Sequence, residues 1–268
     1  MSDRRTTLRA AIAAIPDGAT VALGGNTLHR VPCAAVHEIV RQGKRGLQLV
    51  KTAGAYDVDL LCAAGCAEAV AAGFIGFETP FGMAPAYRRA VESGAVEARE
   101  HVCASVIAGL RAAIQGVPFM PLAGMTGSDL PAARGFRFVA DPYGGPAVVA
   151  IPAITPDVAI VHVQETDAAG NARIVGSRFE DVLMAQAARR VIVTTERIVP
   201  RIDADLVAIP GFLIDAVVEA PGGAAPCSCA GEYDYDADAL GDWIAAAKTA
   251  DGARQWIDAR LLAPAATR

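Results

Sequence analysis

Short apolar runs alternate along this chain with segments of helical periodicity. The first run is Thr20–Leu23 and the second is Leu47–Val50, and a helical pattern over about residues 32–42 lies between them. The same order returns with the run Val70–Ile75 and a helical pattern over about residues 85–93. Strands that alternate with helices form parallel sheets rather than hairpins, so the sequence predicts an α/β fold, an open and mostly parallel sheet flanked by helices.

The remainder of the chain fits the same interpretation. Further strands are predicted over residues 148–153, 158–163, 191–195, 207–209 and 216–218, and the part from about residue 236 is predicted to be helical. Residues 123–146 are rich in glycine and proline, so we expect an irregular excursion there, of a kind that is usually functional or an interface. Because there is no internal repeat and no clear linker, we expect residues 1–268 to form one domain.

The composition excludes several classes of protein. The 268 residues are 53% hydrophobic and carry a formal net charge of -5, which fits neither a disordered chain nor a nucleic-acid binder with its basic surface. No apolar run reaches the ~20 residues of a membrane span, and the residues after Met1 lack a signal-peptide core. We therefore expect a soluble, cytoplasmic protein that binds neither nucleic acid nor a membrane.

Metal and triad chemistry have little support in the sequence. None of the six cysteines forms a Cys-x-x-Cys pair or a zinc-knuckle pattern, and His162 with Glu165 has no metal-ligand spacing. There is also no Gly-x-Ser-x-Gly elbow for a nucleophilic serine. We expect no metal site and mostly buried, structural cysteines.

Three loops follow the first three predicted strands and meet at one edge of the sheet. They are Gly24–Thr27, Lys51–Ala55 and Gly76–Gly82. Open α/β sheets bind ligands at the carboxyl ends of their strands, so this rim is the predicted binding site. The Gly24-Gly25 pair matches neither the Rossmann nor the Walker motif, which leaves NAD and ATP without support. A tight turn and a close approach to a ligand explain the pair equally well.

Two side chains near this rim are candidates for catalysis. Glu78 is the only carboxylate of its loop, and its neighbours Phe77 and Pro80 give it an apolar setting that suits proton transfer. Cys103 follows Glu100 by three positions at a predicted helix start, where a helix N-terminus can make a thiol more nucleophilic. A solvent-facing acid and a packed cysteine are the alternative interpretations.

Five segments in chain order resemble the α subunits of family I CoA-transferases. They are Gly24-Gly25 with the helix that ends Glu38-Ile39-Val40-Arg41, and then residues 156–162, 167–172, 187–196 and 209–224. Within that family they are similar to the α subunit of glutaconate CoA-transferase and its relatives, which include the α subunit of a CoA-dependent ring-opening hydrolase of steroid degradation. The resemblance covers nearly all of the chain and implies the NagB/RpiA/CoA-transferase-like fold.

The resemblance also implies half of an enzyme. Such transferases are heterodimers or heterotetramers of α and β subunits, in which a β-subunit glutamate carries CoA as a thioester and the α subunit closes the active site. Coenzyme A would enter as an acyl-CoA substrate, and no bound cofactor is expected. The residues that match, by region, the α-subunit parts facing that glutamate are Gly24, Gly25, Asn26, Thr27, Phe77, Thr79 and Glu100.

Three functions remain open at this point. A transferase would move CoA between an acyl-CoA and a carboxylic acid. A ring-opening hydrolase would use a base of this subunit, and the acidic residue of those hydrolases falls near Cys103 here, which leaves Glu78 or Glu100 for that role. A non-catalytic ligand-sensing domain on the same fold is the third. Arg30 and Lys51 are either ligands for a carboxylate or the CoA phosphates, or solvated surface charges.

Overall fold

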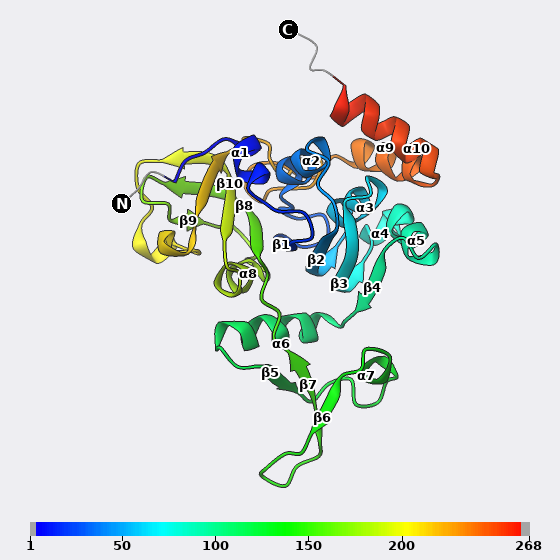
Figure 1. The fold of residues 1–268 in the computed structure, drawn as a ribbon. Coiled ribbons are helices and arrows are strands. Elements are labelled where there is room, and N and C mark those ends of the chain that lie inside the picture. Colours follow the sequence, from blue (N-terminus) through cyan, green and yellow to red (C-terminus); the bar gives the residue numbers. More distant parts are fainter. Residues whose placement is uncertain (1–3, 264–268) are drawn as a thin grey trace.

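The structure, a computed structural model, describes residues 4–263 and centres on one large sheet (Figure 1). The strands of this sheet are β1 (Thr20–Leu23), β2 (Leu47–Gly54), β3 (Ala67–Ile75), β4 (Glu97–Glu100), β8 (Val158–Asp167), β9 (Ala172–Arg173), β10 (Val191–Val199) and β11 (Ala216–Glu219). Their order is β11-β10-β8-β1-β2-β3-β4, all parallel, and β9 pairs antiparallel with β8. The predicted fold class is confirmed.

Helices cover both faces of this sheet. On one face lie α1 (Leu8–Ala13), α2 (Cys33–Arg41), α3 (Tyr56–Ala63), α5 (Pro85–Glu92), α9 (Ala237–Ala247) and α10 (Ala250–Ile257), and on the other lie α6 (Cys103–Ile114) and α8 (Asp181–Ala187). β1 shows the pattern, because Val21 and Leu23 join the first core while Ala22 packs with α6 and α8. A central parallel strand is apolar on both faces for this reason. Among the described residues, no helix has the length and apolarity to cross a membrane.

The chain changes direction across β1. It runs from β1 through β2 and β3 to β4 on one side, and then crosses to β8, β10 and β11 on the other. The carboxyl ends of β1 and β8 therefore flank the switch point, where doubly wound sheets open a crevice for ligands. The loop Gly24–Thr27 follows β1 directly and lies at this point.

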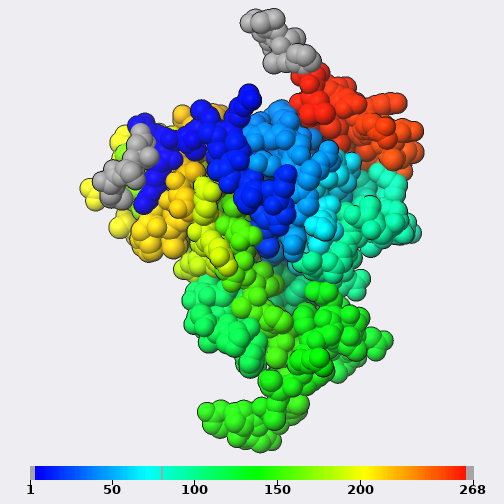
Figure 2. Space-filling view, viewed as in Figure 1, coloured from blue at the N-terminus to red at the C-terminus, as the bar shows by residue number. Residues whose placement is uncertain are grey.

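A small second sheet projects away from the main body. It contains β5 (Phe119–Leu122), β6 (Arg137–Val139) and β7 (Val148–Pro152) in the antiparallel order β5-β7-β6, and α7 (Leu130–Ala133) precedes β6. Figures 1 and 2 show this part as a green arm below the main sheet. The stretch over residues 123–146, for which we expected an irregular excursion, thus contains a short helix and a strand.

Four further helical turns complete the described elements. They are α4 (Glu78–Phe81), the 3-10 turns η1 (Ala204–Leu206) and η2 (Gly211–Leu213), and the π-helical turn η3 (Asp258–Leu262). The strand predicted over Val207–Ile209 does not form. Ile209 makes only an isolated bridge to Ala172, because the backbone turns at η1 and again at η2.

A buried carboxylate connects the C-terminal helices to the main body. Asp59 of α3 accepts a 2.9 Å hydrogen bond from Nε1 of Trp243 in α9 and a 2.7 Å bond from the backbone N–H of Tyr87. Burial raises the pKa of Asp59 to about 6, although both hydrogen bonds act in the opposite direction. Asp59 is therefore ionised at neutral pH and depends on these donors.

Replacing Trp243 by Phe tests this contact through its pH dependence. We expect W243F to lower the free energy of unfolding by about 1–2 kcal/mol at pH 7, where the lost bond is to a charged acceptor. The loss should be smaller at pH 5, because Asp59 is then protonated in the folded wild type and in the folded variant, whose Asp59 pKa lies higher still without the Trp243 donor. Urea unfolding at several pH values measures this.

Trp256 provides a matched control. Its ring packs against Trp243, and its buried Nε1 has no hydrogen-bond partner in the described part of the chain. W256F should therefore show a loss that does not change between pH 4 and 7. A pH-independent loss in W243F would contradict the role given to Asp59.

Candidate functional site

A buried ion pair joins the loop after β1 to the start of α8. The guanidinium of Arg30 pairs with Asp181, and their side chains are 3% and 0% exposed. Asp181 also accepts a 2.7 Å hydrogen bond from the backbone N–H of Gly25. Arg30 donates in addition to the carbonyls of His162 and Ser177, both at 2.9 Å. Charge and geometry together fix the loop at the switch point.

The two glycines of this loop are required by packing. Gly25 has a φ of +71°, and a Cβ there would lie 2.5 Å from the carbonyl oxygens of His29 and Arg30. A Cβ on Gly24 would lie 2.9 Å from the Asp181 carboxylate. Atoms of the chain itself therefore fill the space beside both glycines. The structure shows the tight turn, and the approach of a ligand to this pair stays a prediction.

Arg30 and Lys51 are structural cations in this structure. Lys51 is fully buried, donates a 2.8 Å hydrogen bond to the carbonyl of Gly24 and forms an ion pair with Asp57. Arg30 is equally enclosed by Asp181. Neither expectation for these two residues was right, since they are not solvated and their charges are already paired.

Glu78 lies at the rim beside the glycine loop. Its Oε1 accepts a 2.6 Å hydrogen bond from the hydroxyl of Thr27. Both residues have left-handed backbones, with φ of +61° for Glu78 and +44° for Thr27, a strained arrangement of the kind found at functional sites. The Glu78 side chain is exposed and Phe77 is fully buried beneath the loop. The apolar enclosure expected for the carboxylate is absent.

A second carboxylate, which the sequence reasoning missed, lies at the same edge. Glu180 immediately precedes α8, and its Oε2 accepts a 2.6 Å hydrogen bond from the buried hydroxyl of Thr52 in β2. The Thr52 carbonyl in turn accepts a 3.4 Å bond from the thiol of Cys103. In the sequence, Glu180 lies more than 70 positions from Cys103 and 128 from Thr52, so only the fold reveals this group.

Cys103 is at the start of α6, as predicted, and its side chain is exposed. Burial of part of the thiol and the negative charge of Glu180 raise its pKa. The thiol therefore stays protonated at neutral pH, which disfavours the nucleophilic role considered for it.

The remaining predicted residues do not form one group. Glu100 is exposed at the end of the edge strand β4 and makes no side-chain hydrogen bond within residues 4–263. Thr79 is exposed next to Glu78, and Asn26 is half-buried in the turn that it closes with His29. The structure brings Thr27 to Glu78, and Cys103 to Glu180, while Glu100 stays apart.

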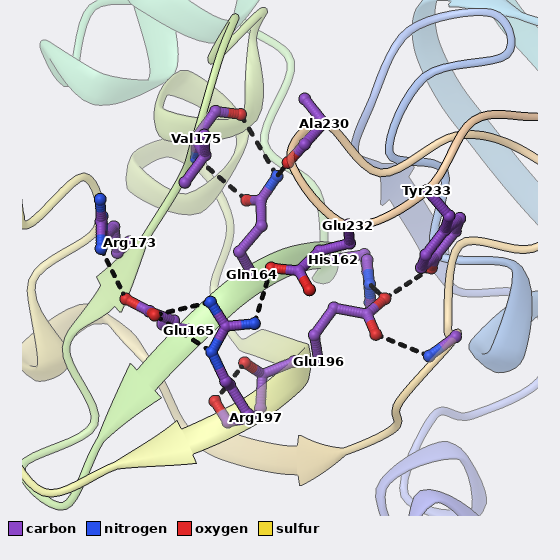
Figure 3. A network of polar contacts seen from close by, with 12 residues as sticks. His162, Gln164, Glu165, Arg173, Val175, Glu196, Arg197, Ala230, Glu232 and Tyr233 are labelled. Carbon is purple, nitrogen blue, oxygen red and sulfur yellow. Dashed lines mark hydrogen bonds and ion pairs between the residues drawn. The ribbon is translucent and has the colours of Figure 1, made fainter.

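A second, buried network connects the middle of β8 with the middle of β10 (Figure 3). His162 is 2.8 Å from Glu196 through Nε2 and 2.9 Å from Thr194 through Nδ1. Glu196 also accepts bonds from the Tyr233 hydroxyl at 2.5 Å and the Gly222 N–H at 2.6 Å. Burial alone would raise the pKa of Glu196, but these hydrogen bonds outweigh it and lower the pKa to about 2.

The same network contains a set of possible metal ligands. Ligand atoms of His162, Glu196 and Cys229 lie within 4.8 Å of one another. The hydrogen bonds already satisfy both nitrogens of His162 and both oxygens of Glu196. Burial raises the pKa of Cys229 to about 12, which opposes formation of the thiolate that a metal needs. We interpret the cluster as structural, and the lack of a metal site remains a prediction.

Removing the charge of Asp181 tests the anchor of the glycine loop. We expect D181N to lower the free energy of unfolding by about 3–5 kcal/mol, since Arg30 would be left as an unpaired buried charge. The matched carboxylate-to-amide control is E92Q, which breaks the exposed Arg88–Glu92 pair and should leave the free energy of unfolding nearly unchanged. Urea unfolding compares the two variants, and equal small losses would contradict the role of the pair.

The chain matches the coenzyme A transferase family model over residues 5–220. It is 37% identical to one of the subunits of the 3-oxoadipate CoA-transferase of Pseudomonas knackmussii, over 94% of this chain and 91% of that protein. It is 34% identical to the cholesterol ring-cleaving hydrolase IpdA subunit of Mycobacterium tuberculosis, over 97% of this chain and 94% of that protein. An uncharacterised protein of Archaeoglobus fulgidus is 40% identical over 91% of this chain, which spans only 56% of that protein.

The fold agrees with these sequence relatives. The crystal structure of glutaconate coenzyme A-transferase from Acidaminococcus fermentans superposes with a TM-score of 0.93 and 32% identity, covering 98% of this chain and 90% of that one. The family match spans more than half of the chain, and relatives above 30% identity are covered over most of their length. The chain therefore belongs to the coenzyme A transferase family.

Proposed function

We propose that the chain is the α subunit of a heteromeric CoA-transferase that moves CoA between an acyl-CoA and a carboxylic acid. The observation that carries this proposal is the rim at the switch point. It presents two carboxylates, Glu78 and Glu180, and each accepts a hydrogen bond from a threonine hydroxyl, which lowers its nucleophilicity. The thiol of Cys103, at the same rim, has a raised pKa. A partner subunit would supply the attacking group.

The chemistry is a double displacement on a glutamate of the β subunit. Its carboxylate attacks the acyl-CoA carbonyl and the CoA thiolate leaves, which gives a mixed anhydride. The thiolate then attacks the glutamyl carbonyl, so that the acyl group departs as a carboxylate and CoA remains on the enzyme as a thioester. An acceptor carboxylate reverses these steps and leaves as the new acyl-CoA.

The α subunit would shape and polarise the reaction space. Glu78 and Thr27 are hydrogen-bonded to each other at the rim, where the exposed carboxylate and its hydroxyl partner can orient the substrate and exclude misplaced water. The P. knackmussii relative is one of the subunits of a CoA-transferase, which supports both the activity and the need for a second subunit. We expect a cytoplasmic heterodimer or heterotetramer with no bound cofactor.

The second candidate is a CoA-dependent ring-opening hydrolase. It is favoured by Glu180, which brings a carboxylate to Cys103, close to where those hydrolases are expected to have an acid, and by the similarity to the IpdA subunit. In this reaction Glu180 or Glu78 would take a proton from the water that attacks a ring carbon of the CoA-bound substrate.

Trapping the intermediate separates the two functions. The chain, purified with its β subunit, is mixed with acyl-CoA, treated with borohydride and analysed by mass spectrometry. We expect one glutamate of the β subunit to be reduced to the alcohol and this chain to stay unmodified, because Glu78 and Glu180 are held by threonine hydroxyls. Turnover without any trapped thioester would contradict the transferase mechanism, and reduction of Glu78 or Glu180 would contradict the division of labour.

Glu78 has its own test. E78Q keeps the size of the side chain but removes the negative charge of the carboxylate that accepts the hydrogen bond from the Thr27 hydroxyl. We expect kcat/KM to fall by about 100-fold. The control is E97Q, in the exposed Glu97–Arg99 pair on β4, which should change kcat/KM by less than about twofold. Equal and mild effects of both variants would exclude a role for Glu78 in turnover.

A further inference from the structure

An apolar groove opens next to Glu78. It has a volume of about 360 Å³, within the range of small-molecule pockets, and begins where β3 ends. Its walls include Phe74, which is 46% exposed, and Met83, which is 62% exposed. The other lining residues are Ile75, Gly76, Glu78, Thr79 and Gly82. A groove that shares Glu78 with the candidate site is continuous with it.

The loop after β3 fixes the shape of this groove. The N–H of Phe77 donates a 2.7 Å hydrogen bond to the Gly82 carbonyl, and Gly76 forms a bridge with Met83, so the loop closes on itself. A Cβ on Gly76 would lie 2.8 Å from the ring of Phe74, which means that the glycine lets this ring lie against the loop. The backbone of the loop therefore holds the apolar walls in place.

The groove contains a negative charge but no positive one in its lining. Glu78 is the only charged residue in its lining, and no Lys or Arg is present there. Arg88, Arg89 and Lys248 line a neighbouring hollow that meets the groove at Met83 but lie outside the lining of the groove itself. Arg88 is paired with Glu92, and Arg89 donates to the Ala247 carbonyl. A carboxylate at the far end of an acyl group would enter beside Glu78 without a counter-charge, which is unfavourable.

We propose that this groove receives the tail of the acyl group and selects apolar, monocarboxylic acyl chains, branched or aromatic, over dicarboxylic ones. The inference rests on the proposed transferase function and names the substrate class of the same site. This substrate class differs from the dicarboxylic substrates in the names of the 3-oxoadipate and glutaconate CoA-transferase relatives. Selection follows from the absence of a cation in the lining and the presence of Glu78.

The test compares isovaleryl-CoA and benzoyl-CoA with glutaryl-CoA as donors to the complete α–β enzyme, with acetate as acceptor. We expect kcat/KM to be about 100-fold higher for the two apolar donors. M83K places a cation in the groove, and should lower kcat/KM for isovaleryl-CoA about 10-fold while raising it for glutaryl-CoA. The control F212K adds the same charge at a residue that is 78% exposed and outside the groove, and should change neither value.

Each other outcome overturns the proposal. Equal kcat/KM for glutaryl-CoA and isovaleryl-CoA in the wild type means that the groove does not select the acyl tail. Loss of β-subunit binding in M83K, with F212K still assembled, means that the partner covers the groove. If the enzyme transfers CoA from none of the donors, the proposed function fails. The affinities of the enzyme for isovaleryl-CoA and glutaryl-CoA, measured by calorimetry, then test whether the groove selects apolar acyl tails. Equal affinities would then reject it.

Discussion

The buried ion pair between Arg30 and Asp181 is the interaction on which the rest of the site depends. It spans the switch point, since Arg30 lies in the loop after β1 and Asp181 begins α8. Two buried charges are tolerated only when they are paired and hydrogen-bonded, and here Gly25 and two carbonyls complete the shell. The position of the glycine loop, and with it Thr27, is therefore set by electrostatics as well as by packing.

This ion pair positions two carboxylates, each of which accepts a hydrogen bond from a threonine hydroxyl. Thr27, in the anchored loop, donates to Glu78, and Glu180, one residue before Asp181, accepts from Thr52. Glu180 is thus the chain neighbour of Asp181, and Glu78 is connected to the ion pair through its hydrogen bond with Thr27, which lies three residues before Arg30. The same edge offers no thiolate, because burial and Glu180 keep Cys103 protonated. A rim whose carboxylates are held by threonine hydroxyls and whose thiol stays protonated is what half of a two-subunit active site would present.

Local patterns in the sequence predict much of this molecule, and long-range contacts account for the rest. Apolar runs and glycine turns place β1 and the start of α6 correctly, since these depend on neighbouring residues. The burial of Lys51 depends on Asp57 and on the carbonyl of Gly24, and no local pattern shows that a strand lysine will be enclosed. The hydrogen bond between Thr52 and Glu180 joins residues that are 128 positions apart in the sequence. The arm depends on β7 leaving the main sheet to pair with β5 and β6, although its sequence reads like any other buried strand.

The central claim is that CoA moves by displacement on a carboxylate and that water takes no part. Oxygen isotopes test this most directly, because each half-reaction passes one carboxylate oxygen between substrate and enzyme. With an ¹⁸O-labelled acceptor acid in ordinary water, the account predicts that ¹⁸O appears in the released acid over successive turnovers, by way of the β-subunit glutamate. Release of unlabelled acid throughout, with ¹⁸O entering the product only when the label is in the water, would contradict it.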